Sequence, residues 1–415
     1  MAKSLMVWAQ PSNIWTNGDE LNFFAASDSV TEADTQANCT EDATFSFMAA
    51  RIVAGNSGTA TFGFRDAGAN GSETFQISGV GTNEDAVNSD VLSAGDLFNI
   101  AYTDTGTDST PGWLKTNVAF ALGHGNFHGA GNFAGTICDA QSSTRFMALS
   151  GNTSSDGNAT EDNVEWKQHG YTSFEALQVR IIANARINNS DFKNRINGAD
   201  GSLLCQFAGG ATGLVTDNSP ADSLSDGQTI NTSITLDTGV QDLTLAFVLA
   251  TLKSSSSKSE TWAGAQNGGA RAASATAFYM PIGGFITTTN LAETDARIKV
   301  GFAAVVSNLR CYLSANTYTG NGTLKLYQNG VAVITTTITA SGGAAWYENT
   351  SDTITIDADD ELSFEFDEGT SGSITIHSAG ITFAPVAAGG QQFMMFPPRL
   401  DGMGHGGIFP GNRVQ

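Results

Sequence analysis

The chain has 415 residues and a formal net charge of −22 at neutral pH, from 41 acidic residues against 19 Lys and Arg. A surface this acidic excludes a general nucleic-acid binder, which needs a basic face for phosphate contacts, and a protein that binds anionic membranes. Only 14% of the residues are charged and 47 are Gly, a composition typical of an all-β protein with many turns.

Residues 1–20 are predicted to form an N-terminal arm, with Trp8 and Trp15 as packing anchors. The first residues contain no apolar core of about 7–15 residues, so we predict no signal peptide. No stretch approaches the roughly 20 apolar residues of a membrane span. We therefore expect a protein made in a cytoplasm that reaches the outside of a cell only if a particle carries it there.

One pattern of a small acidic turn followed by alternating apolar residues occurs three times, at 93–102, 225–234 and 357–366. The alternation places the apolar residues on one face of a strand. A repeat at this spacing indicates one structural unit used three times. We predict that the three matched residues that open the alternation hold equivalent buried positions: Phe98, Ile230 and Leu362.

Three further anchors recur in the same order in each unit. They are a middle strand, a turn that ends in Gly, and a closing apolar strand. Two of the turns contain Asn-Gly, the strongest short hairpin signal. The middle strands are 48–52, 177–181 and 309–313, the turns are 65–68, 195–198 and 327–330, and the closing strands surround Phe120, Phe247 and Phe383.

These anchors predict an all-β fold of three tandem antiparallel β-sandwiches with extended N- and C-terminal arms. The segments between the sandwiches show no helical or strand period and have the composition of linkers. The predicted divisions are an N-terminal arm 1–20, sandwiches 21–123, 144–252 and 276–385, a Gly-rich connector 124–143, a Ser/Gly-rich connector 253–275 and a C-terminal arm 386–415.

The C-terminal arm combines many apolar residues with Gly and Pro. Gly and Pro disfavour a long helix or a regular strand that could hide these side chains within the arm. Exposed to water, the same side chains would promote aggregation. We therefore predict that the arm lies on another subunit and that its interface residues are Phe393, Met394, Met395, Phe396, Leu400, Met403, Ile408 and Phe409.

No catalytic motif is recognisable, so we predict no enzyme, no cofactor and no metal site. His124 and His128 are spaced as metal ligands can be, but no Cys or carboxylate stands near them in sequence. The acidic run from Asp357 to Glu361 offers oxygen ligands for Ca²⁺, yet a solvated turn is the favoured interpretation. Exposed aromatic residues could stack on sugars, although core or rim packing is favoured for each candidate. The candidates are Trp113, Trp166, Tyr171, Trp346 and Tyr347.

The four cysteines lie far apart in the sequence, without a C-x-x-C pair. Two disulfides could form in an oxidising compartment, whereas isolated buried thiols are the favoured interpretation. The cysteines are Cys39, Cys138, Cys205 and Cys311.

The repeated units resemble jelly-roll domains of tailed-bacteriophage virion proteins, such as head decoration proteins, head fibres and tail-associated adhesins. The resemblance is carried by the opening apolar strands at 23–27, 146–150 and 279–283, by Leu309-Arg310, by the Asn329-Gly330 hairpin and by the closing strand 380–383. It implies a structural or attachment role in a virion, with other virion proteins as partners and a homo-oligomer joined through the arms. Two alternatives remain open: a carbohydrate-binding adhesin that contacts host-surface glycans, and a polysaccharide-degrading enzyme.

Overall fold

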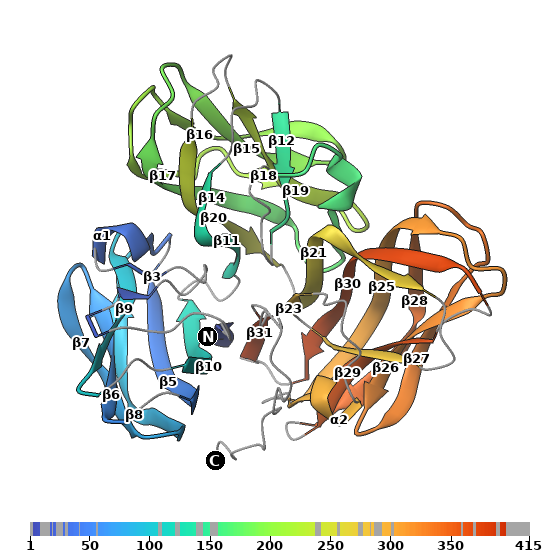
Figure 1. Cartoon of the computed structure of the whole chain (residues 1–415), viewed down its shortest axis with the longest axis horizontal. Helices are drawn as coiled ribbons and strands as arrows, with labels where there is room; N and C mark the ends of the chain where they lie inside the picture. Colours follow the sequence, from blue (N-terminus) through green and yellow to red (C-terminus); the bar gives the residue numbers. More distant parts are fainter. Residues whose placement is uncertain are drawn as a thin grey trace.

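The computed structural model has an all-β fold built from six sheets, with two single-turn α-helices and one 3-10 turn among the described residues. Figure 1 shows three sandwiches in chain order around a common centre. The structure describes residues 3–8, 17–18, 20–21, 28–29, 32–40, 42–54, 57–106, 110–120, 125–137, 144–149, 157–236, 242–254, 258–272, 277–282, 284–285, 293–299, 303–357, 360–367, 371–386 and 391–395.

The first sandwich consists of β1 Lys3–Trp8, β2 Glu20–Leu21, β3 Asp28–Ser29, α1 Glu32–Thr35, β4 Ala37–Asn38, β5 Ala43–Ala54, β6 Thr59–Asp66, β7 Ala69–Ser78, β8 Gly81–Leu92, β9 Leu97–Asp104 and β10 Thr110–Phe120. The second consists of β11 Gly125–Ile137, β12 Thr144–Met147, η1 Glu161–Asn163, β13 Trp166–Lys167, β14 Ser173–Asn184, β15 Ser190–Ile196, β16 Ala199–Phe207, β17 Gly213–Asp217, β18 Asp222–Ser223, β19 Thr229–Leu236 and β20 Leu243–Lys253.

The third sandwich consists of β21 Ser259–Ala272, β22 Phe278–Pro281, β23 Gly284–Phe285, α2 Glu293–Ala296, β24 Ile298–Lys299, β25 Ala304–Asn316, β26 Gly322–Gln328, β27 Val331–Ile338, β28 Ala345–Ile356, β29 Glu361–Asp367 and β30 Ser373–Pro385. One further strand, β31 Gln391–Met395, follows it.

All three sandwiches have jelly-roll strand order. In the first, one sheet runs β1-β10-β5-β8 and the other β2-β9-β6-β7. The second repeats this with β11-β20-β14-β17 and β12-β19-β15-β16, and the third with β21-β30-β25-β28 and β22-β29-β26-β27. Numbering the eight main strands along each unit, the pairs are 1 with 8, 2 with 7, 3 with 6 and 4 with 5. A long hairpin has the same pairs, and rolling such a hairpin into two facing sheets gives the jelly roll.

The first strand of each jelly roll lies in a segment that sequence analysis assigned to an arm or a connector. The prediction that the two connectors contain no strand is wrong, because β11 pairs with β20 and β21 pairs with β30. The N-terminal arm likewise contains β1, which pairs with β10. Only β11 ends its sheet, since β1 also pairs with β31 and β21 also pairs with β23, and the two later strands are rich in Gly. Backbone hydrogen bonds hold them, so side-chain periodicity does not reveal them.

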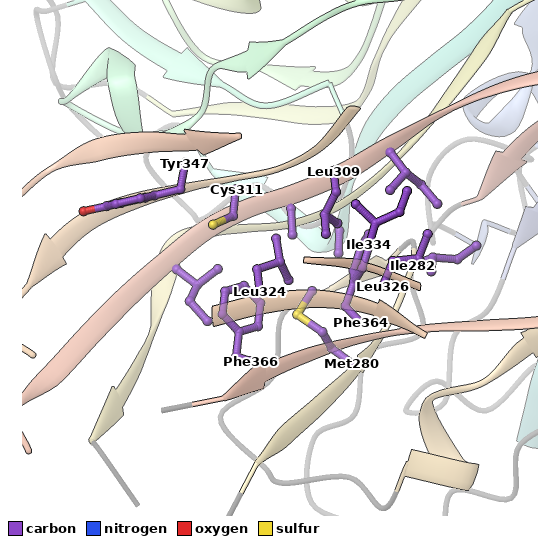
Figure 2. Close-up of a cluster of buried hydrophobic side chains, with 14 of the residues drawn as sticks. Met280, Ile282, Leu309, Cys311, Leu324, Leu326, Ile334, Tyr347, Phe364 and Phe366 are labelled. Atoms are coloured by element: carbon purple, nitrogen blue, oxygen red, sulfur yellow. The ribbon is translucent and has the colours of Figure 1, made fainter. Parts of the chain in front are cut away.

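The predicted equivalence of the three anchor residues is confirmed. Each is buried, and each lies opposite the first residue of a two-residue strand that follows the helical turn of its unit. The pairs are Phe98 with Ala37, Ile230 with Trp166, and Leu362 with Ile298. Each sandwich has its own apolar core. Figure 2 shows the third core, where Leu324, Leu326 and Phe364 lie between the facing sheets.

The predicted hairpins also form, and all three have positive φ at both central residues. Asn197 and Gly198 have φ of 49° and 74°, and Asn329 and Gly330 have φ of 53° and 82°. This geometry matches the right-handed twist of the flanking strands. The first unit has Ala67 at the matching position, with φ of 46°. Alanine has a Cβ but no polar side chain to compensate for a left-handed backbone, so this turn is strained.

Replacing Ala67 with asparagine is expected to raise the free energy of unfolding by about 0.5–1 kcal/mol, because asparagine tolerates the left-handed conformation. Chemical denaturation of the two proteins measures the difference. The matched control is Asn197→Ala, which should lower stability by a similar amount. An Ala67→Asn variant no more stable than the parent would show that the turn holds no strain.

Glu73, on β7 of the first sandwich, is a buried carboxyl group with 0% exposure. Its Oε1 accepts a hydrogen bond from the Met48 backbone N–H at 3.1 Å. Burial, and then repulsion from Asp90, raise the pKa of Glu73 to about 8. The group is therefore mostly protonated at neutral pH in the folded protein, whereas it is ionised in the unfolded chain.

The stability of the protein should fall by about 4 kcal/mol between pH 5 and pH 9 on account of Glu73. Below the ordinary pKa, near 4.5, the carboxyl group is protonated in both the folded and the unfolded state, so it does not lower the free energy of unfolding. Above it the unfolded chain loses the proton first, so stability decreases until the folded group titrates near pH 8. Urea denaturation across this pH range, with Glu73→Gln as the comparison, measures the effect. An equal pH slope in both proteins would contradict the prediction.

Candidate functional site

The most elaborate side-chain chemistry among the described residues lies where neighbouring sandwiches meet. At the junction of the first and second sandwiches, Gln178 of β14 binds the backbone of β4. The Asn38 N–H donates to Gln178 Oε1 at 2.9 Å, and Gln178 Nε2 donates to the Asn38 carbonyl at 2.8 Å. Phe247 and Leu249 of β20 are fully buried and belong to the apolar cluster of the first sandwich. The two sandwiches therefore share a continuous packed interface.

Arg310 of β25 holds the junction of the second and third sandwiches. Its side chain is fully buried, and its Nη2 lies 2.9 Å from Oε1 of the equally buried Glu260 on β21. Its Nε donates to the Lys167 carbonyl of the second sandwich at 2.6 Å. Glu260 Oε1 also accepts the backbone N–H of His169, another residue of the second sandwich, at 2.6 Å. Each member of this ion pair therefore also forms a hydrogen bond with the backbone of the second sandwich.

The two junctions use equivalent positions. Gln178 lies opposite Leu249 on β20, and Arg310 lies opposite Gly380 on β30, at the same place in the jelly roll. Their backbone partners, Asn38 and Lys167, are each the second residue of the short strand in the preceding unit. We call this side-chain-to-backbone contact the lock. Both junctions therefore have a side chain bound to the backbone at the same place, an amide at the first and a guanidinium at the second.

Aromatic rings surround the second lock. The rings of Trp166 and Trp262 stack across the junction with centroids 5.0 Å apart and planes 12° apart. The Arg310 guanidinium lies over Trp262, with Cζ 4.1 Å from the ring centroid. A Cβ at Gly380 would lie 2.7 Å from a ring atom of Trp262, so only glycine accommodates this ring. A desolvated cation–π contact of this kind adds to the ion pair.

A second charged group lies at the edge of this junction. The His169 ring is 7% exposed, and its nitrogens lie 3.0 Å from Asp226 and 3.2 Å from Glu348. Lys167 also forms an ion pair with Glu348. Burial by itself would raise the pKa of Glu348, but hydrogen bonds from His169 and Lys167 outweigh it and hold that pKa at about 2. Glu348 is therefore ionised at physiological pH and links β28 to the second sandwich.

The predicted interface residues of the C-terminal arm fall into two groups. Phe393, Met394 and Met395 lie in β31, which pairs in parallel with β1 of the same chain. The prediction that the arm forms no regular strand is wrong for this segment, because β1 offers a free edge that satisfies its backbone groups. The other predicted interface residues lie outside the described residues: Phe396, Leu400, Met403, Ile408 and Phe409.

The sequence candidates for chemistry are scattered. Trp166, Tyr171 and Tyr347 are buried, so they are not sugar-stacking platforms, whereas Trp346 is partly exposed at the junction. The Asp360 carboxylate accepts hydrogen bonds from the Asp357 N–H and from two side-chain amides of the neighbouring hairpin. His124 and the side chains of His128 and Trp113 lie outside what the structure describes. In the described part of the chain, no group of three or more His, Cys, Asp or Glu side chains is placed to hold a metal ion.

Three of the four cysteines are buried: Cys39, Cys205 and Cys311. Burial raises the pKa of the Cys205 thiol to about 12. Such a thiol is not a nucleophile at neutral pH. Cys138 lies outside the described residues.

The second sandwich carries a shallow, open depression of about 510 Å³, lined by Ile187, Asn188, Asn189, Asp191 and Thr235. Its lining is mostly polar, and Ile187 is 69% exposed beside it. Sequence analysis did not identify this surface. None of the described helices is long and apolar enough to span a membrane.

No protein-family model and no curated protein matches the chain. Among solved structures, a Bacillus thuringiensis Cry1Da tryptic core variant is 12% identical with a TM-score of 0.17 over 53% of each chain, so this chain spans about half of that protein. The structure of infectious bursal disease virus Gx strain matches at 12% identity and a TM-score of 0.18, over 64% of this chain and 72% of that one. PNGF-II matches at 8% identity and a TM-score of 0.19, over 85% and 99%. Likenesses this distant carry no argument about function.

Sequence analysis did not predict the locks. It placed Glu260 in a linker and used Arg310 only as part of a repeated strand pattern. One signal was present: Arg310 alternates with the apolar residues Leu309 and Cys311 in a strand whose other face is core. A charge on the outer face of such a strand is ordinarily solvated, and nothing local indicates that another sandwich covers it.

Proposed function

We propose that this chain is a structural protein of a virus particle, specifically a capsid decoration or fibre component of a tailed bacteriophage that assembles through its terminal segments. The observation that carries the proposal is the fusion of three jelly rolls through repeated, buried junctions. A body joined in this way transmits load between its units and presents a large fixed surface, which suits a building block. Its high negative charge keeps it soluble before assembly.

The test compares two truncated chains for incorporation into purified particles. A chain that ends after Met395 retains β31 and lacks only residues 396–415, whereas a chain that ends after Pro385 lacks both. We expect both to fold, and we expect neither to join the particle if residues 396–415 form the assembly arm. Imaging of the complete particle should show the full-length protein at a fixed position and copy number. Absence of the protein from particles, or normal incorporation of both truncated chains, would overturn the proposal.

A second candidate function is a carbohydrate-binding adhesin, which is favoured by the polar depression on the second sandwich. Asn188, Asn189 and Asp191 offer amide and carboxylate groups of the kind that hydrogen-bond sugar hydroxyls. A glycan array with the full-length protein tests it. Binding that is lost on Asn188→Ala with Asn189→Ala, but kept on the distant Asn70→Ala, would support this function.

A further inference from the structure

The three sandwiches form a head-to-tail series. In each junction the helical turn and short strand of one unit, which we call its head, meet the outer face of the sheet formed by the first, eighth, third and sixth strands of the next unit. α1 contacts β14, and η1 contacts β21 and β25. Contacts between two different surfaces repeat until the series either closes into a ring or continues as an open chain of units.

The closing contact of this series would place the head of the third sandwich against the outer face of the first. At this point the lock is missing. The matching position on β5 is Ala49, which lies opposite Lys115 of β10 as Gln178 lies opposite Leu249. A methyl group can neither donate nor accept a hydrogen bond, so the first sandwich cannot bind the Lys299 backbone of β24 as the other units bind theirs.

β31 makes the connection instead. Five residues, Gln391–Met395, run parallel to β1 in register with Lys3–Val7. β31 also contacts β11, β21 and β30, so it lies among strands of all three sandwiches. In Figure 1 it lies in the central region, between the first and third sandwiches. The end of the third sandwich is therefore tied to the start of the first by backbone pairing. We call β31 the clasp.

We infer that the clasp is exchangeable, and that the β1 edge of one molecule is a docking surface for β31 of a second copy of this chain. The inference rests on the proposed assembly function. Backbone hydrogen bonds between strands are the same whichever chain supplies β31, and a vacated β1 edge is a ready template for a strand. Exchange also presents the head of the third sandwich to the first sandwich of the next molecule. The head-to-tail series then continues from chain to chain.

The length of the segment that joins β31 to the third sandwich, which we call the tether, determines at which protein concentration exchange occurs. Only four residues, 387–390, separate the described end of the third sandwich from β31. A short tether gives the chain's own clasp an effective concentration on the order of 1 mM. At about 0.5 mM protein roughly a third of the clasps should therefore be exchanged, and at a tenfold dilution roughly a twentieth. Exchange is thus suppressed in dilute solution and favoured where many copies are crowded together, as on a particle.

Cysteine trapping of the full-length chain tests the inference. Leu5 and Phe393 lie directly opposite each other in the parallel pairing, so Leu5→Cys and Phe393→Cys place two thiols across it. Both are made in a Cys138→Ser background, because the other three native thiols are buried. The two single variants are mixed, equilibrated at about 0.5 mM and at a tenfold dilution, and oxidised. We expect disulfide-linked dimers of one variant with the other, in a fraction that falls with dilution.

Two controls complete the experiment. The double variant should form an internal disulfide, which shows that the clasp closes within one molecule. Pairing Leu5→Cys with Gln391→Cys, two residues out of register, should give far fewer dimers. A mixture that stays monomeric while the double variant closes internally would overturn the exchange, and so would a double variant that forms no disulfide. Either result is independent of particle incorporation, so it is distinguishable from failure of the proposed function.

Discussion

Replacing Arg310 with methionine is expected to lower the free energy of unfolding by about 3–5 kcal/mol, because Glu260 would remain as a buried charge without its partner. Both side chains are fully buried and their charged atoms lie 2.9 Å apart. The substitution also removes the hydrogen bond to the Lys167 carbonyl and the contact with the face of Trp262. The lost contacts belong to the junction as well as to the third sandwich. We therefore expect the second and third sandwiches of the variant to unfold in separate transitions, because the junction that couples them is weakened.

Urea denaturation followed by tryptophan fluorescence measures this loss, since Trp166 and Trp262 stack across the junction. The double variant Arg310→Met with Glu260→Leu should recover most of the stability, because it leaves no buried charge unpaired. Gln178→Leu at the matched first lock should cost less, about 1–3 kcal/mol, because the groups that lose their partners there are neutral. A loss below about 1 kcal/mol for Arg310→Met would mean that water reaches Glu260.

Replacing Phe98 with alanine is expected to lower the free energy of unfolding by about 3–5 kcal/mol, the usual cost of truncating a fully buried aromatic residue. Phe98 is 1% exposed on β9. Its ring centroid lies 4.8 Å from that of Phe45 and 6.3 Å from that of Phe64, so the truncation leaves a cavity among aromatic rings of both sheets.

Thermal and urea denaturation of Phe98→Ala measure the loss, with Leu362→Ala at the matched position of the third sandwich as the control. Leu362→Ala should cost about 2–5 kcal/mol and should destabilise the third sandwich rather than the first. Phe98→Leu, which keeps most of the volume, should cost much less than either. If both alanine variants melted the same sandwich, the assignment of separate cores would be contradicted.

The sequence by itself determined the repeated unit and its register. Period-two alternation identifies the strands that have one face in a core, because burial of that face selects apolar residues at every second position. This is why Phe98, Ile230 and Leu362 can be matched by pattern alone, and the structure places them at one position of the jelly roll. The Asn-Gly turns are predictable for a similar reason, since a left-handed backbone favours few residue types.

Only the tertiary structure decided how the units are completed and joined. The strands β11, β21 and β31 are held through backbone hydrogen bonds, which every residue except proline can make, so their side chains carry little signal of strand structure. The locks at Gln178 and Arg310 depend on a different sandwich lying over the outer face of the strand. Whether a polar residue on that face is solvated or buried is determined by a surface more than a hundred residues away in the sequence. The sequence pattern around Gln178 or Arg310 therefore cannot predict that another sandwich covers it.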